Sequence, residues 1–189
     1  MILQRITKMK SVKKLCGILL LGCCLMSCNS KHSTNQQEQD DLELRKSIHL
    51  SKCYAYHLIA NDSIKEGIQI LDSLWNTYHL DRMIPCGIGC AYYKVGEMDS
   101  AMFWFRRAES HIDSMIKIQP SEPLYCDKLP LTCILRGKEA ALEVKDKLTS
   151  EVWIEQADSF LENFTGPSAF LEDVTRDMFE AYKRSDYVR

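Results

Sequence analysis

Cysteine is the residue type with the most varied chemistry in this chain, which has 9 cysteines among its 189 residues. Cys86 and Cys90 are four residues apart, so on a helix both thiols share one face and could supply two ligands to a soft metal. A zinc site needs two more ligands, and no neighbouring C-x-x-C or H-x-x-x-H motif supplies them. The cysteines that follow residue 28 are odd in number, so at least one stays unpaired in the monomer: Cys53, Cys86, Cys90, Cys126 and Cys133. We expect small, buried, hydrophobic side chains here, with no metal and no other cofactor.

Catalytic motifs are missing from the sequence. It contains no nucleophile elbow, phosphate loop, H-E-x-x-H motif or paired carboxylates, and its five histidines are scattered. Glu109, His111 and Asp113 are close in sequence, but on a helix they alternate around the surface and do not converge. We therefore expect a solvated helix face here, and a protein that is not an enzyme.

Cys28 has a separate context. Five basic residues between Arg5 and Lys14 precede an apolar run of about 12 residues, too short to span a bilayer, which ends in Leu25-Met26-Ser27-Cys28. This segment resembles a bacterial lipoprotein signal peptide with its lipobox. The resemblance implies cleavage after Ser27, so that 1–27 is the signal peptide, and a diacylglycerol on the Cys28 sulfur, usually with a third acyl chain on the new amino terminus. Two or more chains anchor a protein almost permanently.

Two alternatives to this processing remain. Leu20-Leu21-Gly22-Cys23 is a second lipobox-like tetrad, although the apolar run ends only at Cys28. The same segment is also compatible with an uncleaved signal anchor or a short buried helix.

The mature chain is acidic. Residues 28–189 carry 19 Lys and Arg against 26 Asp and Glu, a net charge near −7. That balance argues against nucleic acid and against electrostatic binding to anionic lipid head groups, which leaves the lipid anchor as the contact with a membrane. Its 162 residues fit one domain.

The remaining sequence predicts an all-α protein. Residues 29–41 contain no apolar residue, so we expect 28–41 to form a disordered tether, followed by a helical domain over 42–185. From Leu42 onward, apolar residues recur at helical spacing. Breaks, most of them at Gly, Pro or Asx residues and one at about Ser150, divide this domain into helices that pair as four hairpins. The predicted helices are 43–60, 64–78, 82–95, 98–117, 122–136, 138–148, 151–163 and 168–184.

One helix pair, 82–115, has a more specific pattern. It resembles the tetratricopeptide repeat, TPR, at seven signature positions: Ile88, Gly89, Tyr92, Gly96, Ala101, Phe105 and Ala108. Residues 48–81 can be aligned with 82–115 by a shift of 34 residues, the length of that repeat. In this alignment small residues match small residues and apolar residues match apolar residues, and Asp62 takes the place of the turn glycine. The rest of the chain matches weakly. The resemblance implies a TPR-like α-solenoid of about four helix hairpins, and the alternative is an unrelated helical bundle.

A TPR-like solenoid usually binds a peptide or protein segment on the concave face formed by the first helix of each pair. Helical geometry predicts eight residues on this face, which we call the inner face: His49, Lys52, Tyr56, Ile59, Met83, Cys86, Cys90 and Tyr93. The alternative is that later helices cover the face and make these residues part of the core.

Four Asp-Ser-aliphatic triplets resemble the O-glycosylation acceptor motif of exported Bacteroidetes proteins, with Ser63, Ser73, Ser100 and Ser114 as the acceptors. The same triplets also suit helix N-caps.

Together with the lipobox and the repeats, these triplets give the chain its best overall resemblance, a TPR lipoprotein of the Bacteroidetes cell envelope. That resemblance implies a location on the outer membrane, on its periplasmic side or at the cell surface. The function expected is a scaffold or adaptor for a protein partner, and the alternative is an immunity or inhibitor lipoprotein that neutralises one toxin or enzyme.

Overall fold

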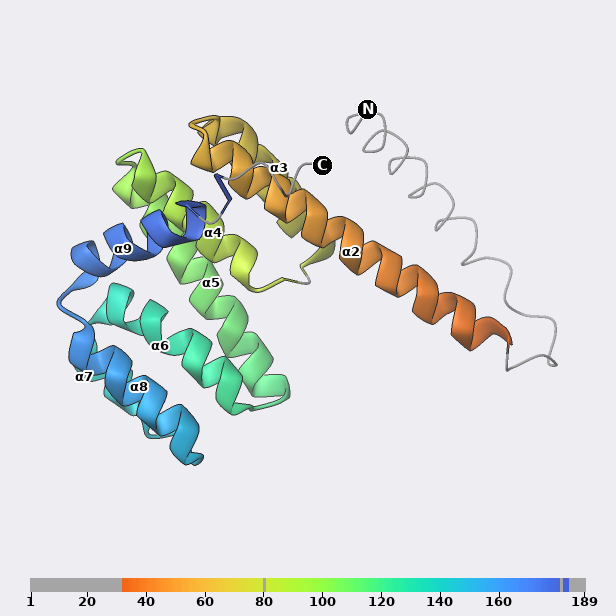
Figure 1. Cartoon of the computed structure of the whole chain (residues 1–189). Helices are drawn as coiled ribbons and strands as arrows, with labels where there is room; N and C mark the ends of the chain where they lie inside the picture. The colour runs from red at the N-terminus through yellow and green to blue at the C-terminus, as the bar shows by residue number, and fades with distance from the viewer. Residues whose placement is uncertain (1–31, 80, 181, 184–189) are drawn as a thin grey trace. The chain divides into compact units, whose positions relative to one another are not determined.

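The computed structural model describes residues 32–79, 81–180 and 182–183, and over these residues the protein is all-α, without a strand (Figure 1). The chain divides into two compact units, residues 1–44 and 45–189. In the first unit, the described residues are the amino-terminal part of a helix, α2. In the second unit, the described residues form the rest of α2 and seven further helices.

The helix bounds agree closely with the prediction. The helices are α2 His32–Ala60, α3 Ile64–Tyr78, α4 Met83–Lys94, α5 Met98–Ile118, α6 Glu122–Arg136, α7 Lys138–Lys145, α8 Glu151–Asn163 and α9 Pro167–Glu180. Every end lies within four residues of its predicted place except the start of α2.

Residues 32–41, which we expected to be disordered, belong to α2. Adding residues to the end of an existing helix costs little, because only nucleation is unfavourable, and Gln and Glu have good helix propensity. Side chains 37–43 are exposed. The absence of apolar residues therefore predicted the exposure of this segment but not its conformation. Residues 28–31 lie outside the described part of the chain.

Several turns between helices contain residues with positive φ, two of them at equivalent places in successive helix pairs. Asp62, between α2 and α3, has φ 66°, and Gly96, between α4 and α5, has φ 79°. This conformation reverses the chain tightly, and Asx and Gly tolerate it best. The two residues are 34 positions apart in sequence.

Glycines also allow the helices to cross closely. A Cβ atom on Gly89 of α4 would lie 2.6 Å from the ring of Phe105 on α5, and one on Gly67 of α3 would lie 2.7 Å from the carbonyl oxygen of Ala55 on α2. Contacts this short do not occur between real side chains. Ala101 and Ala108 of α5 are fully buried. Small residues are thus required where α2 meets α3 and where α4 meets α5.

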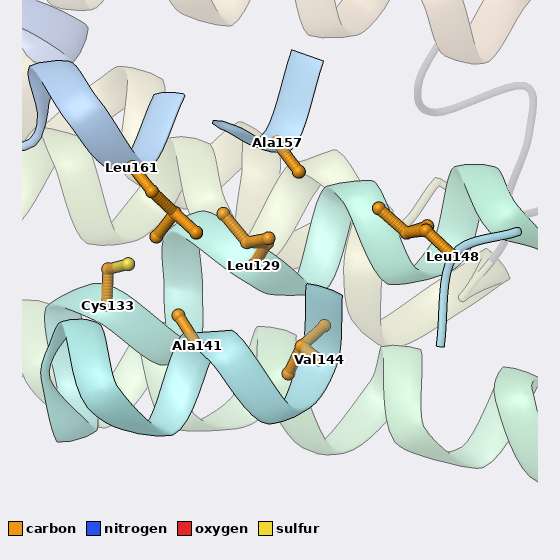
Figure 2. Packing of buried hydrophobic residues seen from close by; sticks show 7 residues of the cluster. All are labelled: Leu129, Cys133, Ala141, Val144, Leu148, Ala157 and Leu161. Carbon is orange, nitrogen blue, oxygen red and sulfur yellow. The ribbon is translucent and has the colours of Figure 1, made fainter. Parts of the chain in front are cut away.

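Helices α6, α7 and α8 share a hydrophobic cluster (Figure 2). Leu129 and Cys133 extend from α6, and Ala157 and Leu161 from α8. The cluster is completed by Ala141, Val144 and Leu148. The side chain of Glu122, at the start of α6, adds a polar link by accepting hydrogen bonds from the backbone N–H groups of Thr149 and Ser150 at 2.6 and 2.7 Å. This carboxylate therefore holds the start of α8 against α6.

Helix α9 returns to the earlier helices and packs on α4 and α6 (Figure 1). Its residues Leu171, Thr175 and Phe179 are buried, and their spacing of four places them on one side of the helix. The burial of this stripe explains why α9 turns back toward the helix pairs.

Candidate functional site

The eight residues of the inner face lie on α2 and α4 and differ widely in exposure. Tyr56, Ile59, Cys86 and Cys90 are buried, at 4, 0, 8 and 1% exposed. Lys52 and Tyr93 are half-buried, whereas His49 and Met83 are exposed. Only one end of the predicted face is therefore open to solvent.

The buried part is covered by α9 and the residues that follow it. The ring of Tyr56 meets those of Phe179 and Tyr182 edge-on, with centroids 5.9 and 5.1 Å apart. The Tyr93 hydroxyl donates a hydrogen bond to the carbonyl oxygen of Ser168 at 3.1 Å. A Cβ atom on Gly87 of α4 would lie 2.6 Å from the Tyr56 ring, so this glycine makes room for the tyrosine.

This arrangement matches the alternative in which later helices cover the face. Tyr56, Ile59, Cys86 and Cys90 are core residues in this structure, and the open groove that we expected at these positions is not present. The spacing of residues on α2 and α4 indicates which side of each helix they share, but not which segment packs there. A role of this face in partner binding stays a prediction.

At the open end of the inner face, charged residues surround a hollow of about 350 Å³. Arg45, His49 and Arg82 line it together with Ile48 and Asp81. Most of these charges are already paired: Lys52 forms an ion pair with Asp81, and Arg82 forms one with Asp127 of α6 at 2.5 Å. Asp81 also accepts a hydrogen bond from the backbone N–H of Met83 at 2.9 Å. These contacts fix the start of α4.

The five cysteines among the described residues are free thiols. Cys53, Cys86, Cys90 and Cys133 are buried, and Cys126 is half-buried. Burial removes water that would solvate a thiolate, which raises the pKa of Cys86 well above its usual value and the pKa of Cys90 and Cys133 to about 11. The thiols of Cys86, Cys90 and Cys133 are therefore protonated at neutral pH and pack as hydrophobic side chains, as we expected. No group of three or more metal-ligand side chains occurs within the described residues.

Glu109, His111 and Asp113 of α5 do not converge on one point. Glu109 binds Arg136 at 2.5 Å and accepts a hydrogen bond from the buried Thr132 at 3.0 Å, both on α6. Asp113 pairs with Lys128, also on α6. The His111 ring meets the Trp75 ring edge-on, with centroids 4.8 Å apart. Partial burial of His111 lowers the pKa of its imidazole. Each of the three side chains is therefore held by a different neighbour.

The modification sites predicted from the sequence differ in how well the structure describes them. Cys28 and its competitor Cys23 lie outside the described residues. Ser63, Ser73 and Ser114 are exposed and Ser100 is half-buried. Ser63 precedes α3 without forming a side-chain cap, and the Ser100 hydroxyl donates to Glu97 at 3.2 Å. The hydroxyl groups of Ser63, Ser73 and Ser114 are therefore accessible to a modifying enzyme, and O-glycosylation of these serines stays a prediction.

A second hollow, which the sequence did not predict, lies between α8 and α9. Its volume is about 640 Å³, and three phenylalanines contribute to its lining: Phe160, Phe164 and Phe170. A signal for it was visible in the sequence, because Phe160 and Phe164 are one helical turn apart and Phe170 follows shortly after Gly166-Pro167.

Comparison with known proteins finds no match among family models, curated proteins or solved structures. In the described part of the chain, none of the helices combines the length and the apolar character needed to cross a bilayer.

Proposed function

We propose that this protein is a lipid-anchored cell-envelope scaffold or adaptor, which binds a protein partner through TPR-like helix hairpins. The repeat is supported by the correspondence of residues 34 apart. Asp62 and Gly96 both have positive φ, Ala55 and Gly89 both form close crossings, and Leu71 and Phe105 are both fully buried. Equivalent positions in the two hairpins therefore meet the same steric requirements.

One observation carries the binding function: the inner face already holds an amphipathic helix. α9 presents Leu171, Thr175 and Phe179 to the earlier helices, and its amino-terminal end is joined to α8 only through the short turn at 164–166. Recognition of a helix in a groove depends on apolar side chains spaced by one helical turn, which a partner helix can offer as well as α9 does. We propose that a partner of this kind binds in exchange with α9.

The anchor would be a lipid on Cys28, which places the protein on the outer membrane, either on its periplasmic side or at the cell surface. The acidic mature chain adds no electrostatic attraction to anionic lipid. The hairpins would then be presented close to the membrane, at the end of residues 28–41.

Site-specific photo-crosslinking in intact cells tests this proposal. A photoreactive amino acid at Met83, which is 40% exposed at the open end of the inner face, should capture one protein. Phe179→Ala should increase the yield several-fold, because a weakened α9 exposes the face more often.

The matched control places the same group at Leu142, which is 45% exposed on α7 and outside the inner face. Equal capture from both positions, or a yield that Phe179→Ala leaves unchanged, would contradict binding at this face. Capture of a single toxin or enzyme that loses its activity on binding would instead support the inhibitor function.

A further inference from the structure

The hollow between α8 and α9 arises because the two helices pack on different neighbours. α8 packs on α6 and α7, whereas α9 packs on α4 and α6, so the two helices diverge from the turn at 164–166 (Figure 1). Phe170 meets Phe160 and Phe164 with centroids 5.2 and 5.7 Å apart, which joins the helices near this turn. A volume of about 640 Å³ lies within the usual range of ligand sites.

The walls of this hollow combine apolar rings with acidic and amide groups. The three phenylalanines are half-buried, and Val152 at the outer end is 60% exposed. Glu155 and Asp173 contribute one carboxylate from each helix, and no Lys or Arg occurs among the described residues that line the hollow. A ligand here would find an apolar base between two negative walls.

The surrounding charge is strongly one-sided. Residues 151–180 contain eight Asp and Glu but a single basic residue, Arg176. Arg176 is paired with Asp173 at 2.8 Å and with Asp177 at 3.2 Å. The other residues after position 27 carry 18 basic and 18 acidic side chains, so the net charge of the predicted mature chain comes entirely from α8, α9 and their turn. Such a field attracts cations and repels anions.

We propose that the hollow between α8 and α9 docks a basic segment of a partner protein, with an apolar side chain of that segment seated on Phe160, Phe164 and Phe170. Aromatic rings at the base favour an apolar or aromatic anchor, and the carboxylates of Glu155 and Asp173 select Lys or Arg beside it. A second copy of this acidic face would be repelled, as would nucleic acid or anionic lipid. The site lies outside the inner face but includes Phe170 and Asp173 of α9, so it exists only while α9 covers that face.

The test uses the full mature chain and a fluorescent 12-residue peptide of alternating Lys-Lys and Leu-Leu pairs with one central Trp. Fluorescence anisotropy should show micromolar binding that weakens at least tenfold from 0.1 to 1 M salt, because the screening length falls from about 10 to about 3 Å. Glu155→Lys combined with Asp173→Lys should weaken binding at least tenfold. Both residues are exposed on their helices, and circular dichroism checks that α9 stays helical once the pair between Asp173 and Arg176 is removed.

Two controls make the result specific. Glu143→Lys reverses an exposed charge on α7 outside the hollow and should change the affinity less than twofold. Replacement of the peptide's Trp by Ser should weaken binding at least fivefold if the phenylalanines seat an apolar anchor. Equal loss in the Glu143 variant, unchanged binding in the double variant, or equal binding of a peptide with Glu in place of Lys would each overturn the proposal.

Discussion

Cys90 illustrates how a residue with reactive chemistry becomes structural. The residue is 1% exposed on α4, beneath α9, and burial raises its pKa to about 11. A thiol that stays protonated is a poor nucleophile and a poor metal ligand, so its contribution here is packing. The same argument applies to Cys133, in the cluster of α6, α7 and α8.

These thiols make stability depend on pH in a defined direction. An unfolded cysteine ionises near its ordinary pKa of 9.0, whereas Cys90 in the folded protein holds its proton up to about pH 11. Between these values the unfolded state binds fewer protons, so the free energy of unfolding falls as pH rises. One thiol contributes a slope of up to about 1.4 kcal/mol per pH unit.

We therefore predict that Cys90→Ala loses stability less steeply than the parent protein between pH 9 and pH 11. Urea unfolding followed by circular dichroism at several pH values measures the two slopes. Cys126→Ala, which removes a half-buried thiol, is the matched control and should change the slope less. Parallel curves for the parent and Cys90→Ala would show that Cys90 ionises freely in the folded protein.

For individual residues, the sequence predicted which side of a helix a residue lies on better than it predicted which segment packs against that side. Gly89 and Ala101 are small residues at signature positions of the repeat, and both are buried where α4 and α5 cross closely. Tyr56 was correctly placed on one side of α2 with Lys52, yet the segment that covers it begins more than 100 residues later. Local periodicity contains no information about that contact, because it depends on how the last helix packs.

Among the elements, α8 depends on a side chain from another helix. The carboxylate of Glu122 accepts hydrogen bonds from the Thr149 and Ser150 backbone N–H groups and from the Thr149 hydroxyl, which together lower its pKa. These bonds satisfy donors just before the first turn of α8, as an N-cap does within a helix. The start of α8 was predicted correctly from Ser150, but this link from α6 was not, since it joins residues 27 and 28 positions apart.

We predict that Glu122→Gln speeds amide hydrogen exchange in the first turn of α8 and lowers the stability of the protein. Because the folded pKa of Glu122 is depressed, its contribution is present above the ordinary value of 4.5 and is lost as pH falls through the folded pKa. The parent and the variant should therefore differ most near neutral pH and converge in acid.

Glu151→Gln is the matched control, because Glu151 is an exposed acidic residue in the first turn of α8 itself. It should change exchange in that turn less than Glu122→Gln does. Equal effects would mean that general negative charge near the helix start, rather than the link from α6, protects this turn.

In the protein as a whole, the sequence of the amino-terminal segment predicts where the protein is located, and the helical repeats predict that it binds a protein partner. The lipobox at Leu25 to Cys28 is a prediction from residue types alone, because a signal peptidase would recognise the sequence of this segment rather than its fold. The arrangement of α8 and α9, in contrast, follows from which neighbours each one packs against, so the spacing of Phe160, Phe164 and Phe170 indicates an aromatic cluster but not the hollow between the two helices.

We predict that Cys28→Ala abolishes lipidation and releases the protein from membranes or blocks its maturation. Metabolic labelling with a fatty-acid analogue and membrane fractionation measure both effects. Cys23→Ala is the matched control and should be labelled as strongly as the parent. The opposite result, with label lost only in Cys23→Ala, would move the lipidation site to Cys23.

Because α9 and Tyr182 cover the inner face, this protein can complete its fold only after its last helix has been synthesised. His57 Nδ1 lies 2.9 Å from the carbonyl oxygen of Tyr182, a contact that joins positions 125 residues apart. A chain that emerges amino terminus first presents α2 and α4 long before α9 exists, so Tyr56, Ile59 and Cys90 stay exposed during synthesis. Contacts between such distant positions form late and slow the folding of a domain. We expect the first hairpins to depend on chaperone protection until the last helix arrives, which ties the solubility of the newly made protein to its carboxyl-terminal residues.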